Sequence, residues 1–372
     1  MQLPPVRASI GLCIHWVLNG HRRCVTRSAE DPGGATRYGL IMLTRLEVDG
    51  FKNLLDFSVD LGPFTCIAGP NAAGKSNIFD AIEFLSLLSD YSFMEAAQRL
   101  RSAGQRGSDP RTLFWQDPTK SETRMILSVE MIVPSEVEDD FGRVVEPTTS
   151  FLRYDLELEY QPPENIGFGV QGRIVLVREE LRHIKLGDAA GRLPWPHSKK
   201  QFRDKVVTGR RSGVAYISTS SDEAGAGIVN VHQDGGSRGQ PRTSPAARAP
   251  RTVISTTTTS DDPTILAARR EMQQWRSLAL EPSAMRSPDS ASESSRIAPN
   301  GAHLAAALYR LAAAEGDGIY QIVASEAAAL TIGNPYVRSA GWAHLHDRST
   351  RANDWFLESE DGGLLSGKGR HC

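Results

Sequence analysis

The chain has 372 residues, of which 40% are hydrophobic and 23% are charged, and its net charge is −2. This composition is typical of a soluble globular protein, and the charge balance gives no global basic field that would attract nucleic acid. The four cysteines form no C-x-x-C pair, so neither a zinc site nor a disulfide framework is indicated: Cys13, Cys24, Cys66 and Cys372. No run of 18 apolar residues is present, so we expect no membrane span.

The first 41 residues differ from the rest of the chain. They contain Asp31-Pro32-Gly33-Gly34 and no sustained periodicity, which predicts a disordered or loosely packed extension. From Met42 onward a strand pattern begins at once. Two interpretations therefore stay open, an N-terminal extension or a chain whose natural start is Met42.

A glycine-rich segment fits the pattern G-x-x-x-x-G-K-[ST] of the phosphate-binding P-loop, also called Walker A. It reads Gly69-Pro70-Asn71-Ala72-Ala73-Gly74-Lys75-Ser76. The apolar residues 64–68 before it predict a buried strand, with Cys66 as a core thiol. The residues after it carry apolar side chains at helical spacing, namely Ile78, Ala81, Ile82 and Leu85. Strand, loop and helix in this order are the context that the motif requires.

The residue types in this loop suit a triphosphate. Glycines let the backbone curl so that N–H groups face the phosphates, and the following helix adds its positive N-terminal end. The lysine can reach the β- and γ-phosphates, and the serine hydroxyl can bind Mg²⁺. We therefore expect ATP and Mg²⁺ as cofactors, with Ser76 as the Mg²⁺ ligand and these residues as nucleotide contacts: Gly69, Pro70, Asn71, Ala72, Ala73, Gly74, Lys75, Ser76 and Asn77.

Downstream, the periodicity predicts a mixture of helices and strands. A helix is expected over 77–101, and helical patterns recur at 263–280 and 301–330. Alternating segments at 125–133, 151–160 and 174–177 predict an antiparallel β layer. Two shorter strand candidates lie at 214–217 and 228–232, and the Ser- and Pro-rich residues 281–299 are expected to form a loop.

A first strand ending in Gly50-Phe51-Lys52-Asn53, a second strand, and then Gly-Pro-Asn-x-x-Gly-Lys-Ser-Asn resembles a known family. It is similar to the ABC-type ATPase heads of the RecF, SMC and overcoming-lysogenization-defect (OLD) group, in its AAA branch of predicted bacterial ATPases. The resemblance covers about residues 42–336. It implies an α/β fold, with a P-loop NTPase core of the ABC-type head and an added antiparallel β layer. It also implies Mg-ATP hydrolysis coupled to dimerisation through the head, with DNA repair or phage defence as the setting.

The same resemblance adds further candidate residues. Lys52 and Asn53 become candidate nucleotide contacts. In such heads a glutamine senses the metal and the γ-phosphate, and Gln116 is the candidate, although an ordinary surface glutamine is the other interpretation. A basic stretch from Arg192 to Arg211 could touch DNA, but it lacks interleaved aromatic residues, and we favour a solvated loop.

The C-terminal part does not continue the family pattern. No run of four apolar residues ends in Asp-Glu, so the Walker B strand, which supplies a Mg²⁺ ligand and a general base, is missing, and no clear signature segment is found. His344 and His346 stand two residues apart, and we interpret them as part of an unordered tail. Two explanations compete, an ATPase truncated before Walker B, which we favour, or a nucleotide-dependent interaction module without hydrolysis.

These observations predict five regions and a cytoplasmic protein. The regions are an extension at 1–41, an ATP-binding lobe with the β layer at 42–185, a polar insertion at 186–262, a helical part of the head at 263–336 and an atypical tail at 337–372. The C-terminal part of the fold is expected to be incomplete.

Overall fold

The computed structural model describes part of the chain in detail. The described residues are 12–13, 42–62, 65–70, 73–100, 109–116, 123–163, 172–193, 214–223, 225–234, 240–289, 297–316, 318–321, 323, 356–358 and 364–366. The chain consists of two compact units, Met1–Ser277 and Leu278–Cys372. Among the helices in the described ranges, none is long and apolar enough to cross a membrane.

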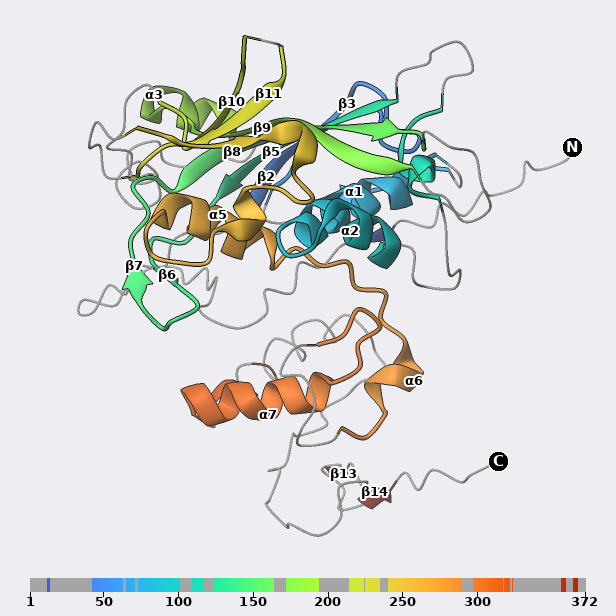
Figure 1. Ribbon diagram of the computed structural model, residues 1–372. Coiled ribbons are helices and arrows are strands. Elements are labelled where there is room, and N and C mark those ends of the chain that lie inside the picture. Colours follow the sequence, from blue (N-terminus) through green and yellow to red (C-terminus); the bar gives the residue numbers. More distant parts are fainter. Residues whose placement is uncertain are drawn as a thin grey trace, which may run out of the picture. The chain divides into compact units, whose positions relative to one another are not determined.

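The first unit is built on an eight-stranded sheet (Figure 1). Its spatial order is β12-β11-β10-β9-β8-β5-β2-β3, and every neighbouring pair is antiparallel. The strands are β2 (Met42–Asp49), β3 (Phe57–Asp60), β5 (Arg124–Ile132), β8 (Phe151–Gln161), β9 (Arg173–His183), β10 (Ile217–Ser221), β11 (Gly227–Val231) and β12 (Arg242–Pro245). The three long alternating segments of the sequence thus lie together as β5, β8 and β9, as predicted.

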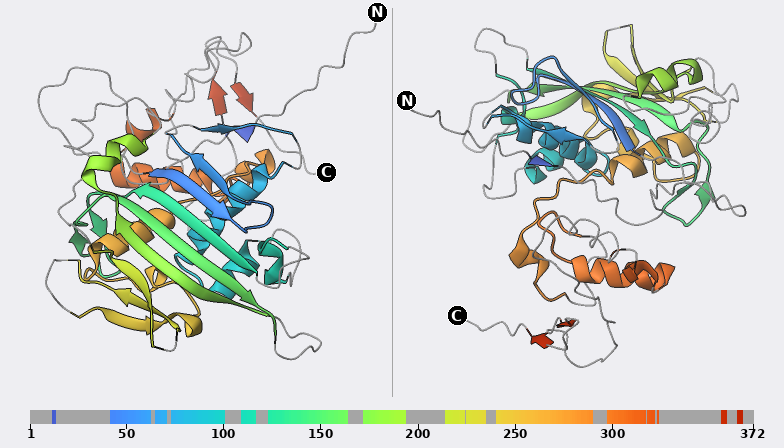
Figure 2. Two further views of the ribbon diagram at one scale, coloured as in Figure 1. Left: turned by 90° about the horizontal axis from the view of Figure 1, so that it is seen from above. Right: turned by 180° about the vertical axis from the view of Figure 1, so that it is seen from behind.

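Helices cover one face of this sheet (Figures 1 and 2). They are α1 (Lys75–Leu88), α2 (Phe93–Arg99) and α5 (Pro263–Met272). Successive residues of a strand point to opposite faces, so alternate residues of β5 enter the main core, namely Met125, Leu127, Val129 and Met131. Ile82, Phe84 and Leu85 of α1 pack against the same core. The described part of this unit thus combines helices with an antiparallel sheet, which agrees with the expected antiparallel layer; no pair of its described strands is parallel.

The opposite face of the sheet carries charged side chains. Arg153 of β8 donates to Glu47, Glu130 and Asp155, which come from β2, β5 and β8. At one end a short segment, α3 (Leu186–Ala189) with the 3₁₀ turn Ala190–Arg192, folds over this face. It packs on a second, smaller apolar cluster: Ile132, Phe151, Ile184, Ala189 and Leu193. The sheet is therefore buried on one side and mainly ion-paired on the other.

The buried carboxylate of Glu179 joins the sheet to the segment at residues 252–254, which also contacts the end of α1. Glu179 of β9 accepts hydrogen bonds from the backbone N–H groups of Val253 (2.7 Å) and Ile254 (3.0 Å) and from the Tyr154 hydroxyl (3.1 Å). Burial raises the pKa of Glu179 to about 7, against the lowering effect of these donors. In the same segment the Thr252 hydroxyl donates to the carbonyl of Leu88, at the end of α1.

Several expectations about local structure are wrong. The predicted helix at 77–101 is two helices, because α1 ends at Leu88 and α2 begins after Ser92 with a capping box between Ser92 and Glu95. The helix predicted over 263–280 ends at Met272. The predicted loop at 281–299 contains a four-residue helix, α6 (Pro282–Met285).

The strand before the glycine-rich loop also differs from the prediction. β4 comprises only Cys66–Ile67, and it pairs with β1 (Leu12–Cys13) rather than with the eight-stranded sheet. Cys66 is exposed, so its assignment as a buried core thiol is wrong. The reason is that, in the described part of the chain, β4 has no strand of the large sheet beside it to cover its side chains.

In its described residues, the second unit contains a twelve-residue helix, α7 (Leu304–Glu315), within the helical region predicted at 301–330. The Asp289 carboxylate accepts the backbone N–H of Ala306 (2.9 Å) in the first turn of this helix and contacts the His303 ring (3.0 Å). Two further strands, β13 (Phe356–Glu358) and β14 (Leu364–Ser366), pair with each other. His344 and His346 lie outside the described residues, as does the part of the basic stretch from 194 to 213.

Candidate nucleotide site

The glycine-rich loop leads directly into the first turn of α1. Gly74 precedes this helix in a left-handed conformation (φ 89°), no side chain of the described residues caps the helix start, and the first turn holds no acidic residue. The first N–H groups of a helix have no intrahelical acceptor, and the helix dipole places a partial positive charge there. This end of α1 is therefore a suitable site for an anion. Asn71 and Ala72 lie outside the described residues.

Lys75 bends back over the loop. Its ammonium group donates to the backbone carbonyls of Gly69 (2.7 Å) and Pro70 (2.6 Å). Ser76, the next residue, is exposed. The positive charge of Lys75 thus lies at the loop, beside the N-terminal end of α1.

The donor set fits a magnesium nucleotide rather than a metal bound by protein alone. Within the described ranges, no group of three or more His, Cys, Asp or Glu side chains is placed to hold a metal ion. Mg²⁺ in nucleotide sites takes most of its oxygens from phosphates and water, with few from the protein. A single exposed hydroxyl, that of Ser76, is sufficient for such a role.

The turn at residues 50–54 lies along α1 and approaches its N-terminus. Phe51 stacks on Phe84 with ring centroids 5.8 Å apart. Lys52 forms an ion pair with Asp80. The Asn53 side chain accepts a hydrogen bond from the side chain of Asn77 at 2.7 Å. Three consecutive turn residues therefore contact three successive turns of the helix.

Asn53 also explains why residue 74 has no side chain. A Cβ built at Gly74 would lie 2.7 Å from the amide nitrogen of Asn53 and 2.8 Å from its oxygen. The glycine thus serves both the left-handed backbone and this close approach. The structure brings together three of the predicted site residues, Asn53, Gly74 and Asn77, while the Lys52 ammonium is paired with Asp80.

Gln116 lies at the other end of the turn. The Lys52 N–H donates to the Leu113 carbonyl (2.8 Å), and the Trp115 N–H donates to the Gly50 carbonyl (2.7 Å). The two segments therefore run antiparallel, and the exposed Gln116 lies beyond Gly50, on the side away from Asn53. Its role as a sensor of the γ-phosphate stays a prediction.

The acidic residues of α1 that face the turn at 50–54 are not among the predicted site residues. Asp80 holds Lys52, and Glu83 lies beside both residues. Burial and the nearby Asp80 raise the pKa of Glu83, while Lys52 lowers it. The spacing along the helix indicates that Asp80 faces the turn, because Asn77, Asp80 and Phe84 follow each other at intervals of three and four residues and so share one face.

Comparisons with known proteins agree with this architecture. Residues 42–205 match the family model described as an AAA ATPase domain. A curated relative, the OLD nuclease of Thermus scotoductus, is 50% identical over 44 residues, which are 12% of this chain and 8% of that protein. No solved structure matches. The chain thus spans a small part of the curated relative that it matches.

The match begins at β2, includes the glycine-rich loop and α1, and continues through β5, β8 and β9. It implies a P-loop NTPase fold that binds nucleotide. The matched residues include the strand, loop and helix at 66–88 and the antiparallel strands β5, β8 and β9. The AAA ATPase domain at residues 42–205 and the partial match to the OLD nuclease together support an ATPase of the RecF/SMC/OLD-like AAA group.

Proposed function

We propose that the chain binds Mg-ATP through residues Gly69–Asn77, as the nucleotide-binding half of an ABC-type ATPase head. The observation that carries the proposal is the uncapped start of α1 after the left-handed Gly74, with the Lys75 ammonium over the loop. These are the donors and the charge that a polyphosphate needs. Mg²⁺, when bound with the nucleotide, supplies the charge neutralisation that phosphoryl transfer requires.

The residues have distinct roles in this proposal. The loop amides and the first-turn N–H groups hold the phosphates. Lys75 exchanges its carbonyl partners for phosphate oxygens, and the Ser76 hydroxyl orients the metal. Asn53 keeps the turn at 50–54 against the loop through Asn77. No residue is assigned to activating water, so binding is proposed for this chain and hydrolysis for the ATPase group.

Isothermal titration of ATP with Mg²⁺ tests the binding step. Wild-type protein should bind, and Lys75→Ala should weaken binding strongly, because a charge-assisted contact to phosphate is lost. Lys185→Ala removes an exposed lysine on the charged face of the sheet and serves as the matched control. Equal ATP affinity of wild type and Lys75→Ala would refute the proposal.

Phosphate release then separates the two candidate activities. Turnover above the Lys75→Ala background would favour the ATPase, and binding without turnover would favour an interaction module held together by nucleotide. Head dimerisation would show as an increase in mass upon addition of ATP.

The curated relative is named a nuclease, and we propose nucleic acid, with DNA as the first candidate, as a partner of this chain. DNA affinity that falls steeply with salt and changes with ATP would support it.

A further inference from the structure

The short strands β1 and β4 place two cysteines directly opposite each other. The strands pair antiparallel, and their register sets Cys13 opposite Cys66. The two cysteines are 53 residues apart in sequence, so their spacing does not indicate that they meet. We call them the Cys13–Cys66 pair. The other two cysteines of the chain, Cys24 and Cys372, lie outside the described residues.

The backbone separation at such a position suits a disulfide bond. Residues directly opposite each other on antiparallel strands have Cα atoms about 4.5 Å or about 5.5 Å apart, depending on the hydrogen bonds of the pair. The Cα atoms of a disulfide lie about 4.4 to 6.8 Å apart, so both kinds of position are within its range. A bond between Cys13 and Cys66 therefore requires no change in the register of the two strands.

The Cys66 thiol is accessible from solution. Successive residues of a strand point to opposite sides, and in β4 the partly buried Ile67 packs against the main core. Cys66 points the other way and is exposed. A thiol reacts with a soluble disulfide only where the reagent can reach it. Cys66 meets this condition, which a cysteine inside the core would not.

The pair lies next to the glycine-rich loop. Cys66 is three residues before Gly69, whose carbonyl accepts the Lys75 ammonium (2.7 Å). β4 has only two residues and, among the described strands, pairs with β1 alone. Two short strands hold each other weakly in water. The strand that leads into the loop therefore depends on a weak pairing, which a covalent bond would make secure.

We propose that the Cys13–Cys66 pair is a redox-sensitive disulfide site that fastens β1 to the strand entering the glycine-rich loop. In the oxidised protein the bond fixes β1 against β4, and in the reduced protein only the backbone pairing joins them. An exposed disulfide is reduced easily, so the bond is reversible and serves as a switch. The proposal goes beyond nucleotide binding and does not depend on it.

The bond forms by thiol–disulfide exchange with a small soluble disulfide such as oxidised glutathione. The Cys66 thiolate attacks one sulfur of this reagent, forms a mixed disulfide and releases one small thiol. The Cys13 thiolate then attacks the Cys66 sulfur and releases the second small thiol. The two protein thiols lose two electrons and two protons, and the reagent gains them as it becomes two thiols, so the reaction is balanced.

Oxidation of the full chain with oxidised glutathione, followed by alkylation and peptide mass mapping, tests the proposal. Of all the pairings that the four cysteines allow, a Cys13–Cys66 peptide should be the main product, and dithiothreitol should release it. The same oxidation in urea is the control, and it should give a mixture of pairings. A main bond from Cys66 to Cys24 or Cys372, a stable glutathione adduct at Cys66, or the urea mixture under native conditions would overturn the proposal.

Hydrogen exchange measures whether the bond fastens the strand. The amides of β4 should exchange about thirtyfold more slowly in the oxidised protein, which corresponds to the lower end of the usual stabilisation by a disulfide. This difference should be lost in Cys13→Ser and in Cys66→Ser, and serine is tolerated at position 66 because the site is exposed. Equal exchange in oxidised and reduced wild type would refute the fastening.

Cys24→Ser is the matched control. It removes a cysteine but keeps the Cys13–Cys66 pair, so both the cross-linked peptide and the slower exchange should remain. Loss of either in Cys24→Ser would contradict the assignment of the pair. No nucleotide is present in these measurements, so a failure of the proposed ATP binding would leave their result unaffected.

Discussion

Replacing Gly74 with alanine tests the contact between the turn at 50–54 and the loop. Two costs are expected. A non-glycine residue at φ 89° costs about 1–2 kcal/mol of folding free energy. The new Cβ also displaces the Asn53 amide, which lies 2.7 Å away, and this breaks the hydrogen bond to Asn77, worth about 1 kcal/mol. Together they should lower the free energy of unfolding by about 2–3 kcal/mol.

Urea denaturation can separate the two costs. In an Asn53→Ala background the displacement is already relieved, so Gly74→Ala should cost only about 1–2 kcal/mol, and the coupling should be about 1 kcal/mol. Gly225→Ala is the matched control, because Gly225 has φ 81° and no atom within 4 Å of its Cβ position. The reasoning is refuted if Gly74→Ala costs the same in both backgrounds, or no more than Gly225→Ala.

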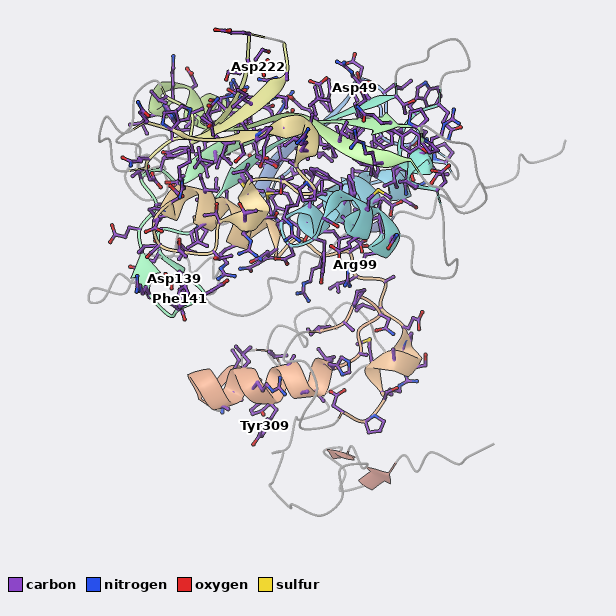
Figure 3. All side chains as sticks on the ribbon, in the orientation of Figure 1. Asp49, Arg99, Asp139, Phe141, Asp222 and Tyr309 are labelled. Carbon is purple, nitrogen blue, oxygen red and sulfur yellow. The ribbon has the colours of Figure 1, made fainter. Side chains whose placement is uncertain are left out.

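Three further predictions concern buried and paired charges. Burial raises the pKa of Glu271 to about 7, so its contribution to the free energy of unfolding should fall by about 3 kcal/mol as pH rises from below 4.5 to above 7. Glu271→Gln should reduce the difference in the free energy of unfolding between pH 5 and pH 8, measured by urea denaturation. An unchanged difference would contradict this prediction. Lys52→Met should lower the free energy of unfolding by about 1–3 kcal/mol, because it leaves the partly buried Asp80 without its partner. It should leave ATP affinity unchanged in a calorimetric titration, and a clear loss of affinity would instead make Lys52 a nucleotide contact. Asp139→Ala should speed amide hydrogen exchange at Phe141, because the Asp139 carboxylate accepts the Phe141 N–H (Figure 3), and Asp139→Asn should speed it less. Equal exchange rates in the two variants would contradict a role of this hydrogen bond in holding residues 139–143.

The features that were predictable from sequence depend on neighbouring residues. Strands β5, β8 and β9 alternate within themselves, and the start of α1 is specified by the glycine spacing of its own loop. The break between α1 and α2 was also visible, because Ser92 and Glu95 form a capping box, but the apolar pattern that continues to Phe93 concealed it.

The rest depends on residues distant in sequence. The burial of Cys66 depends on which strands lie beside β4. The sequence around Cys66 does not indicate which strands these are. The contact of Asn53 with Gly74 joins segments 21 residues apart, and nothing in the spacing requires it. The ion pairs of Arg153 with Glu47 and Glu130 join β8 to β2 and β5, so they become apparent only when these strands lie in one sheet.

The contacts of Phe51, Lys52 and Asn53 also determine how the chain tolerates change in length. They follow one edge of α1 through Phe84, Asp80 and Asn77, so the helix can neither slide nor rotate without losing all three at once. The first turn of α1 therefore keeps its place relative to β2, whatever the path of the chain between residues 55 and 62. Insertions or deletions in β3 and the loop before it should alter the edge of the sheet, while the N-terminal end of α1 stays in place.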